Sequence, residues 1–381
     1  MKKDWTYKKL GEVAEIKAGF TPSATDLHDN GAIPYYKVSD MNTVGNEVVL
    51  TKTSLYTDES KKSFPKGSIV FPKNGAAIAT NKKRILGYNS IVDLNTGVCI
   101  FDSQVQTKYG YYWFQNIDFR NYTRGGALPT LDIKTLKSKS LPIPPLVDQE
   151  LIVRELDLLH SVISKKQEQL RELDNLAQAI FYDMFGDPIT NPMGWEIKKL
   201  GEVCVSELGK TLNQSKDTGV LRPYLCAINI SWGRIDITNL KQTRFEDYEL
   251  DRYSVQKGDL LICEGGDTGR AAIWEKDMPM LYQNALHRVR FNDNVLAVYA
   301  LYWLHYLKMK GEIDNKYSKG VTIKHLVKSS LLSIPIPLPP LSLQQSFAAK
   351  VEAIEAQKQA VQQSIREVEA LLAQRMDHYF N

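Results

Sequence analysis

The residue types that most often perform chemistry are present in this sequence, but their spacing matches no complete catalytic motif. LGKT at 208–211 ends like a phosphate-binding loop, yet Cys204 stands where such a loop requires its first glycine. GGDTGR at 265–270 lacks the G-x-G-x-x-G spacing of a dinucleotide-binding loop and indicates a turn. NPMG at 191–194 lacks the second proline and the aromatic residue of an N-P-P-aromatic adenine-methylating motif. We therefore expect no catalytic residue and no cofactor in this chain.

The histidines and cysteines also form no recognisable site. The six histidines show no metal-ligand spacing, and the four cysteines contain no C-x-x-C pair. Scattered cysteines are typical of proteins from a reducing compartment. The first residues do not resemble a secretory leader, and no run of about 18 apolar residues is present. We expect a cytoplasmic protein with no bound metal and no membrane contact.

The chain instead contains many polar, glycine-containing loops in which lysine, arginine, asparagine and glutamine occur together. Lysine and arginine can neutralise DNA phosphates or bind guanine edges, whereas asparagine and glutamine suit adenine. Any one of these residues fits an ordinary surface loop equally well, so the prediction concerns the set. The candidate DNA-binding residues are Thr21, Ser23, Lys37, Lys73, Asn74, Lys82, Lys83, Arg84, Arg124, Lys210, Asn213, Gln214, Arg234, Arg270, Arg288, Lys319 and Lys324.

The charge distribution agrees with nucleic-acid binding without requiring it. The chain is 43% hydrophobic and 24% charged, and its net charge is +4. Residues 1–146 hold 20 Lys and Arg against 13 Asp and Glu, a net charge of +7, whereas residues 147–186 hold 4 against 8, a net charge of −4. A solvated surface can carry a basic excess of this size, so charge alone names no partner.

The elements that must position these loops occur twice in the sequence. WTYKKLGEV at 5–13 recurs as WEIKKLGEV at 195–203, with seven of nine residues identical and an offset of 190. Short apolar runs bounded by turn residues, such as SIVF and DLLIC, predict β-strands in both blocks. YGYYWFQNI at 109–117 and AVYALYWLHYLK at 297–308 predict one amphipathic helix per block, with its aromatic residues in the core.

Each block ends in a proline-rich stretch and then an a/d heptad pattern of about five heptads, which predicts a long helix. Because neither helix has another apolar surface near it in sequence, we expect the two seams to pack together. Lys166 and Lys358 interrupt the seams, where they either reach out to solvent or set the register. The predicted interface residues are Ile152, Leu156, Leu159, Ile163, Leu170, Leu173, Ile180, Phe347, Val351, Ile354, Val361, Ile365, Val368 and Leu372.

The predicted fold class is α+β, with two similar β-rich domains, each followed by a long helix. The two helices are expected to form an antiparallel coiled coil with pseudo-twofold symmetry. The expected domains are residues 1–146 and 187–341, and the expected helices are residues 147–186 and 342–381. The repeat offset changes from 190 to 195 near the prolines, so we expect five additional residues in the second proline stretch and a different exit angle there.

These features together resemble the specificity subunits of type I restriction-modification systems. The similarity rests on W-x-x-K-K-L-G-E-V at the start of each block, on KGSI at 66–69 and on KGDL at 257–260. It also rests on the proline stretches that lead to Gln149 and Gln344, and on the first helix, which ends near DMFGDP. The similarity covers essentially the whole chain, in the order target recognition domain, helix, target recognition domain, helix.

The resemblance implies that each target recognition domain reads one half of a split double-stranded DNA target, and that the helices set the gap. It further implies two methyltransferase subunits that dock on the chain, carry S-adenosylmethionine and methylate adenine. Restriction subunits can join such a complex. This chain would then be its non-catalytic recognition subunit.

Three other functions stay open at the level of sequence. The same kind of module could serve a type II system, whose partner both methylates and cuts DNA. A coiled-coil scaffold with two protein-binding heads would show no sequence-specific DNA binding even with a partner present. An enzyme would turn over S-adenosylmethionine without any partner.

Overall fold

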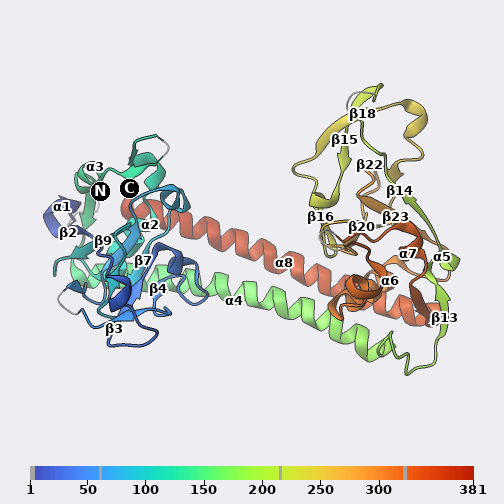
Figure 1. Ribbon diagram of the computed structural model, residues 1–381, viewed down its shortest axis with the longest axis horizontal. Helices are drawn as coiled ribbons and strands as arrows, with labels where there is room; N and C mark the ends of the chain where they lie inside the picture. Colours follow the sequence, from blue (N-terminus) through green and yellow to red (C-terminus); the bar gives the residue numbers. More distant parts are fainter. Residues whose placement is uncertain (1–4, 60–61, 127, 214–216, 321–323) are drawn as a thin grey trace. The chain divides into compact units, whose positions relative to one another are not determined.

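The computed structural model describes residues 5–59, 62–126, 128–213, 217–320 and 324–381. The chain divides into two compact units: unit 1 comprises Met1–Gln167 with Gln363–Asn381, and unit 2 comprises Glu168–Gln362. Each unit therefore contains one β-rich domain and parts of both long helices (Figure 1). Within the described residues, no helix is both long enough and apolar enough to cross a membrane.

The β-rich domain of unit 1 precedes the first long helix. Its elements are β1 (Thr6–Lys9), α1 (Leu10–Val13), β2 (Ala14–Ala18), β3 (Ile33–Tyr36), β4 (Val49–Leu50), β5 (Tyr56–Thr57), β6 (Ile69–Pro72), β7 (Arg84–Leu86), β8 (Ile91–Val92), β9 (Thr96–Phe101), α2 (Thr107–Gln115), β10 (Thr123–Arg124), β11 (Thr130–Leu131), α3 (Ile133–Lys137) and β12 (Ser140–Ile143). The sheets have the orders β2-β9-β6-β7-β4, β5-β3-β8, β1-β12 and β10-β11. Tyr109 and Trp113 of α2 are buried in the core, as expected from the sequence.

The β-rich domain of unit 2 repeats this plan. Its elements are β13 (Glu196–Lys199), α5 (Leu200–Val203), β14 (Cys204–Leu208), β15 (Val220–Leu225), β16 (Ile230–Ser231), β17 (Arg234–Ile235), β18 (Lys241–Phe245), β19 (Ser254–Val255), β20 (Leu260–Cys263), β21 (Ala271–Ile273), β22 (Met280–Tyr282), β23 (Leu286–Phe291), α6 (Ala297–Met309), α7 (Lys328–Leu332) and β24 (Pro335–Leu338). The sheets have the orders β14-β23-β20-β21, β18-β15-β22-β19, β13-β24 and β16-β17. Tyr299 and Trp303 of α6 are buried in the core.

The repeated KKLGEV motif forms the same short helix in both domains. In the first copy the backbone N–H of Lys9 donates to Glu12 Oε2 at 2.6 Å, which stabilises the start of α1. Glu202 does the same for α5, also at 2.6 Å. A Cβ added to Gly11 would lie 3.3 Å from Lys137 Cβ, so glycine allows α1 to approach α3 closely. These requirements explain why the motif appears at the start of each domain.

The two long helices are α4 (Leu146–Phe185) and α8 (Leu341–Phe380), each of 40 residues. In unit 1 the N-terminal part of α4 packs beside the C-terminal part of α8, and in unit 2 the opposite ends pack together (Figure 1). The helices therefore run antiparallel within each unit, which confirms that they pack with each other. Every residue of the predicted seam is buried or half-buried, with Leu156 and Phe347 fully buried.

The last residues of each long helix complete a domain core. Phe185, at the end of α4, packs against Tyr299 in unit 2 with ring centroids 4.8 Å apart. Phe380, at the end of α8, packs against Tyr109 in unit 1 at 5.2 Å. Each domain thus buries the end of the helix that follows the other domain in sequence.

Ion pairs between α4 and α8 differ between the two units. In unit 2, Lys358 Nζ lies 2.7 Å from Asp174 Oδ1 across the helix pair and 2.7 Å from Glu355 on its own helix. In unit 1, Arg375 Nε lies 2.8 Å from Glu155 Oε1. Lys358 therefore contacts the facing helix, which favours the interpretation that it sets register. Partly exposed pairs of this kind contribute roughly 0–1 kcal/mol each to stability, so their effect is on alignment more than on the free energy of unfolding.

The position predicted for the five additional residues is wrong. The proline strands β12 and β24 already differ by 195 residues, and so do α3 and α7, whereas α2 and α6 begin 190 apart. The insertion therefore lies between the start of α6 and α7, where α6 has 13 residues against 9 in α2. Ser140–Ile143 and Pro335–Leu338 must keep equal lengths because each pairs along its whole length with the first strand of its domain.

Candidate nucleic-acid interface

In unit 1, a β-hairpin and the loop after β6 bring several candidate residues together. The N–H of Leu131 in β11 donates to the carbonyl of Lys73 at 2.9 Å, and Asn74 lies opposite Thr130. Thr130 also faces Arg124 across the β10-β11 hairpin. Asn74, Thr130 and Arg124 therefore lie side by side on three adjacent backbone segments, with the Arg124 side chain exposed.

Unit 2 builds the same arrangement from different side chains. Gly265, in the loop after β20, lies opposite His325, and His325 in turn faces Lys319. Lys319 and His325 exchange two backbone hydrogen bonds of 2.8 Å. Lys319 is exposed and takes the place that Arg124 has in unit 1. Arg124 and Lys319 are thus equivalent in structure. The other two positions hold Asn74 and Thr130 in unit 1 but Gly265 and His325 in unit 2.

The other exposed candidates lie on separate loops. Thr21 accepts a hydrogen bond from the N–H of Leu94 at 3.0 Å, and Ser23 donates to Asp26 at 2.6 Å, so both also hold their own loop. Gln214 lies outside the residues that the structure describes. The candidates with exposed side chains are Thr21, Ser23, Lys37, Arg124, Asn213, Arg234 and Lys319.

Two candidate lysines are buried, and we withdraw them as DNA contacts. Lys83 is 0% exposed, and burial lowers its pKa to about 7, an effect that Asp118 opposes. Lys210 is 5% exposed and lies 2.6 Å from Glu249 Oε2 and 3.5 Å from Asp217 Oδ1. An ammonium group enclosed in this way cannot reach a phosphate without leaving its partners unpaired. Loop composition alone gave no sign of which lysines point inward.

Three candidate arginines are half-buried and donate to backbone carbonyls. Arg84 donates to the carbonyl of Met41 at 2.9 Å, Arg270 to that of Ala227 at 2.8 Å, and Arg288 to that of Ser254 at 2.7 Å. Each guanidinium therefore ties two separate backbone segments together. These arginines still carry positive charge near the loops, but their donors are partly committed to the fold.

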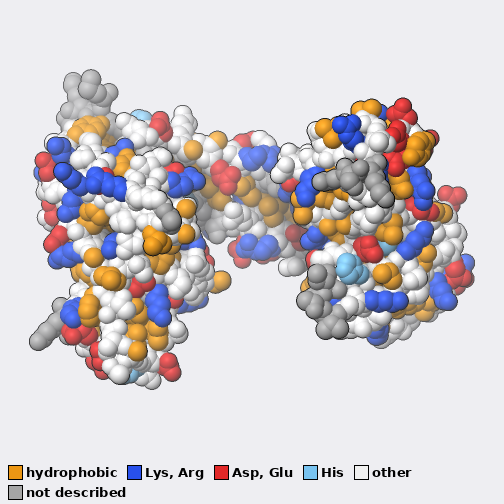
Figure 2. All heavy atoms as spheres, turned by 45° about the horizontal axis from the view of Figure 1, so that its top comes forward, with side chains coloured by type: hydrophobic (Ala, Val, Ile, Leu, Met, Phe, Trp, Pro, Cys, Tyr) orange, Lys and Arg blue, Asp and Glu red, His pale blue; other side chains and the backbone are white. Residues whose placement is uncertain are grey.

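The remaining candidates are partly exposed and also have protein partners. Lys324 Nζ donates to the carbonyl of Asp314 at 2.8 Å, and Lys82 Nζ contacts Asn42. Lys73 and Asn74 are half-buried in the loop after β6. Figure 2 shows Lys and Arg side chains spread over the visible face of each unit and mixed with acidic ones. Among the described residues, no group of His, Cys, Asp and Glu could hold a metal ion.

Two buried glutamines were singled out in the sequence only as matching letters. Gln149 Nε2 donates to the carbonyls of Gln104 and Pro144 at 2.8 and 3.0 Å, and its Oε1 accepts from the N–H of Gln106 at 2.8 Å. Gln344 makes the same three hydrogen bonds in unit 2. Both side chains are 0% exposed. They fasten the start of each long helix to the start of α2 or α6, and so fix each domain on its helix.

Comparison with known proteins gives a consistent result over most of the chain. Residues 2–175 and 192–370 match the family model described as the type I restriction modification DNA specificity domain. The MjaIX specificity subunit of Methanocaldococcus jannaschii is 24% identical, over 92% of this chain and 86% of its own length. The EcoBI specificity subunit of Escherichia coli is 21% identical, over 95% of this chain and 81% of its own length.

Solved structures share the fold. A chain from work on complex assembly and conformational transition of the type I R-M system is 19% identical with a TM-score of 0.65, covering 99% of this chain and 98% of that one. The type I S subunit from M. genitalium is 16% identical with a TM-score of 0.53, covering 99% of this chain and 96% of that one. The predicted order of two β-rich domains, each followed by a long helix, is thus confirmed.

Proposed function

We propose, because this chain belongs to the family of type I restriction-modification DNA specificity subunits, that each of its β-rich domains reads one half of a split DNA target. Members of this family are non-catalytic, so the chain supplies recognition and no reaction chemistry. The recognition domains are residues 1–146 and 187–341. One observation carries the proposal. The two domains repeat the same hairpin and loop, but place Asn74, Thr130 and Arg124 in one and Gly265, His325 and Lys319 in the other.

A shared framework with different side chains is what two readers of different sequences require. Backbone pairing fixes where the side chains stand, and the side chains determine which base edges and phosphates they can bind. If both domains read the same half-site, identical side chains at equivalent positions would be expected. The target is therefore proposed to have two different halves separated by a fixed gap.

The long helices have two proposed roles. They hold the recognition domains apart and so set the gap, and they provide a surface on which two methyltransferase subunits dock. Those subunits would bind S-adenosylmethionine and methylate adenine, and restriction subunits could join the complex to cut DNA. The whole complex would act on double-stranded DNA in the cytoplasm. A partner that both methylates and cuts, as in type II systems, would use the chain in the same way.

The test is selection from a random DNA duplex library by the full chain in complex with the methyltransferase encoded beside it. The expected result is enrichment of a split motif with a constant gap, and no such motif with the methyltransferase alone. Binding without any enriched motif would contradict the proposal and favour the scaffold alternative. Methyl transfer by this chain without a partner would favour an enzyme.

A further inference from the structure

In unit 1, a buried lysine joins the segment before the hairpin to the loop after β6. Lys83 Nζ donates to Asn81 Oδ1 at 2.7 Å and to the carbonyl of Ile117 at 2.6 Å, and it lies 4.3 Å from the ring centroid of Phe119. Asn81 Oδ1 also accepts the N–H of Phe119 at 2.9 Å. Residues 119–122 form a 3-10 turn that leads directly into β10, where the exposed Arg124 lies. The lysine thus links the segment between β6 and β7, which includes Asn74, to the turn that leads into β10 and Arg124.

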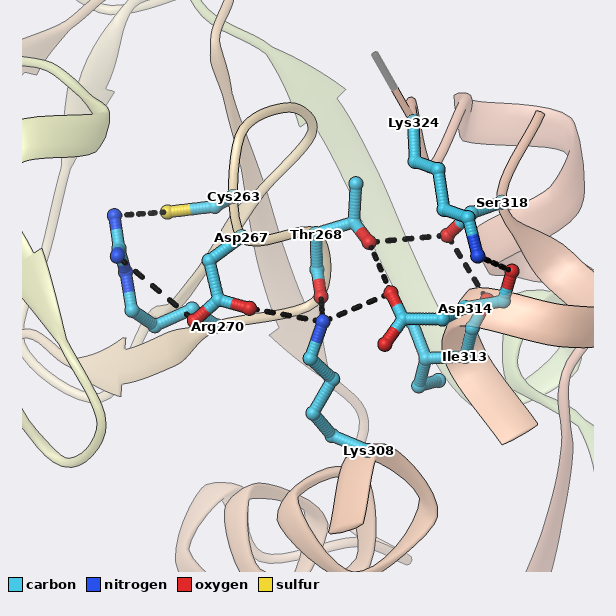
Figure 3. Close-up of polar contacts among 9 residues, drawn as sticks. All are labelled: Cys263, Asp267, Thr268, Arg270, Lys308, Ile313, Asp314, Ser318 and Lys324. Atoms are coloured by element: carbon cyan, nitrogen blue, oxygen red, sulfur yellow. Dashed lines mark hydrogen bonds and ion pairs between the residues drawn. The ribbon is translucent and has the colours of Figure 1, made fainter. Parts of the chain in front are cut away.

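In unit 2, a lysine at the end of α6 links the loop after β20 to the segment before the hairpin (Figure 3). Lys308 Nζ, at the end of α6, lies 2.9 Å from Asp267 Oδ1, from the carbonyl of Thr268 and from Asp314 Oδ1. Thr268 Oγ1 also donates to Asp314 Oδ1 at 2.9 Å. Asp314 belongs to a π-helix, residues 313–317, that leads into the segment with Lys319. Burial lowers the pKa of Lys308, but the hydrogen bonds that its ammonium donates to Asp267 and Asp314 outweigh burial and raise the pKa, so Lys308 stays charged.

The two lysines come from different places in the repeat. Lys83 belongs to the segment that leads from the loop into β7, whereas Lys308 belongs to the helix before the hairpin. In unit 2, strand register makes Ala272 the equivalent of Arg84, so the residue equivalent to Lys83 is Ala271, which carries no charge. The lysine position has therefore not been kept by the duplication, but the link between loop and hairpin segment is present in both units.

We propose that Lys83 and Lys308 are positioning residues for DNA recognition. Lys83 holds the loop after β6, and Lys308 the loop after β20, in a fixed position relative to the hairpin of the same domain. This inference rests on the proposed function and deepens it. Neither ammonium is placed to touch DNA. Each instead fixes the distance between the loop after β6 or β20 and the hairpin segment of the same domain, both of which carry candidate DNA-binding side chains. A site whose parts are displaced by about 1 Å can lose discrimination between DNA sequences while the domain stays folded.

A lysine suits this role because its three donors can bind oxygens from several segments at once. Thr268 is 1% exposed, and a Cβ on Gly269 would lie 2.9 Å from Ile313 Cγ2, so the loop is pressed against the π-helix. Replacing Lys308 by an apolar residue would remove the cation that the carboxylates of Asp267 and Asp314 share, leave Asp267 only its 3.9 Å contact with Arg270, and let these segments separate.

The test uses the full chain in complex with its methyltransferase and fluorescent duplexes of the target selected above. The variants are Lys83→Met and Lys308→Met, and affinity is measured for the intact target and for targets changed in one half. Each variant is expected to lower discrimination about tenfold in one half only, which is roughly the discrimination carried by one base pair. The two variants should affect opposite halves, and Lys308→Arg should recover part of the loss.

Milder variants and matched controls keep the test decisive if a methionine variant fails to fold. Asn81→Gly removes the acceptor of Lys83 and retains the left-handed backbone, since Asn81 has φ 53°. Thr268→Val removes two hydrogen bonds of the Lys308 network, the one that Thr268 Oγ1 donates to Asp314 and the one that it accepts from Ser318. The exposed Lys139 and Lys276, replaced by methionine, should leave both halves unchanged.

Three outcomes would overturn the inference. Equal loss of affinity for all sequences would mean that the lysines act only on stability. Loss of discrimination in the same half of the target by both variants would contradict the claim that each lysine acts in its own domain. Unchanged discrimination by both variants would contradict a positioning role for either lysine. If the unaltered complex showed no sequence preference, the proposed function would fail together with the inference, whereas the other outcomes reject the inference alone.

Discussion

At the scale of single residues, the type of a charged residue did not reveal whether its side chain points into the protein or toward solvent. Lys82, Lys83 and Arg84 are adjacent in sequence, yet they contact Asn42, a buried carbonyl and the carbonyl of Met41 respectively. The sequence predicted that polar loops carry the recognition residues, but it could not separate lysines that hold a loop from lysines that face solvent. Burial depends on contacts with residues far along the chain, such as Ile117 for Lys83, and no local pattern records these.

His287 predicts a loss of stability in unit 2 at acid pH. Its side chain is 0% exposed, Nε2 lies 2.7 Å from the carbonyl of Leu326, and burial lowers its pKa from 6.5 to about 4. Because the partner is a carbonyl, Nε2 must carry the proton, and protonating Nδ1 would bury a charge. The folded state then binds fewer protons than the unfolded state between pH 6.5 and 4. The free energy of unfolding should therefore fall as pH drops through this window.

The measurement is hydrogen exchange of unit 2 peptides in the full chain at pH 7 and pH 5, corrected for intrinsic rates. His287→Gln keeps a donor for Leu326 and should flatten the pH dependence of unit 2. The exposed His28, changed to glutamine, should leave it as it is. Equal pH dependence with and without His287 would show that other groups dominate.

Arg124 and Lys319 predict matched changes in the salt dependence of DNA binding. Both are exposed and occupy equivalent places on the hairpins. If each neutralises one phosphate, Arg124→Gln and Lys319→Gln should each make the slope of log K against log salt shallower by about one. Exposed lysines outside the hairpins, Lys139 and Lys276, should leave the slope unchanged when replaced by glutamine. A hairpin variant that also kept the original slope would remove that residue from the interface.

At the scale of elements, the heptad pattern gave the most reliable prediction. It predicted the two long helices, which run from Leu146 to Phe185 and from Leu341 to Phe380, since a long apolar seam is a local feature that recurs many times. The insertion was misplaced because identical letters near the prolines suggested an alignment that strand pairing does not follow. Strand register is set by the partner strand, here β1 or β13, which lies more than 130 residues away in each domain.

Leu156 and Leu158 provide a direct test of the helix seam. Leu156 is 0% exposed and belongs to the core of unit 1, whereas Leu158 is 64% exposed on the same helix. Leu156→Asp should cost about 3 kcal/mol or more and disrupt both the helix pair and assembly with the methyltransferase. Leu158→Asp should leave the unfolding free energy nearly unchanged. Thermal unfolding and size-exclusion chromatography measure the two effects, and normal assembly of Leu156→Asp would contradict the predicted seam.

At the scale of the whole molecule, the proposed role of the helices makes a prediction about the DNA target. Duplicating residues 160–166 and 355–361 adds one heptad to each helix and keeps the seam in phase. Seven residues lengthen a helix by about 10 Å, and DNA rises roughly 3.4 Å per base pair, so the gap should grow by about three base pairs. The methylated motif of the lengthened protein reports the gap. An unchanged gap would contradict the helices as its determinant.

The most direct test of the central claim is a comparison of methylated bases across a genome. Cells carry the neighbouring methyltransferase gene either with or without the gene for this chain, and modified bases are sequenced genome-wide. The account predicts that a split motif with a fixed gap, methylated at adenine, appears only when this chain is present. Identical methylation in both cultures, with an active methyltransferase, would contradict the claim that this chain supplies the sequence specificity.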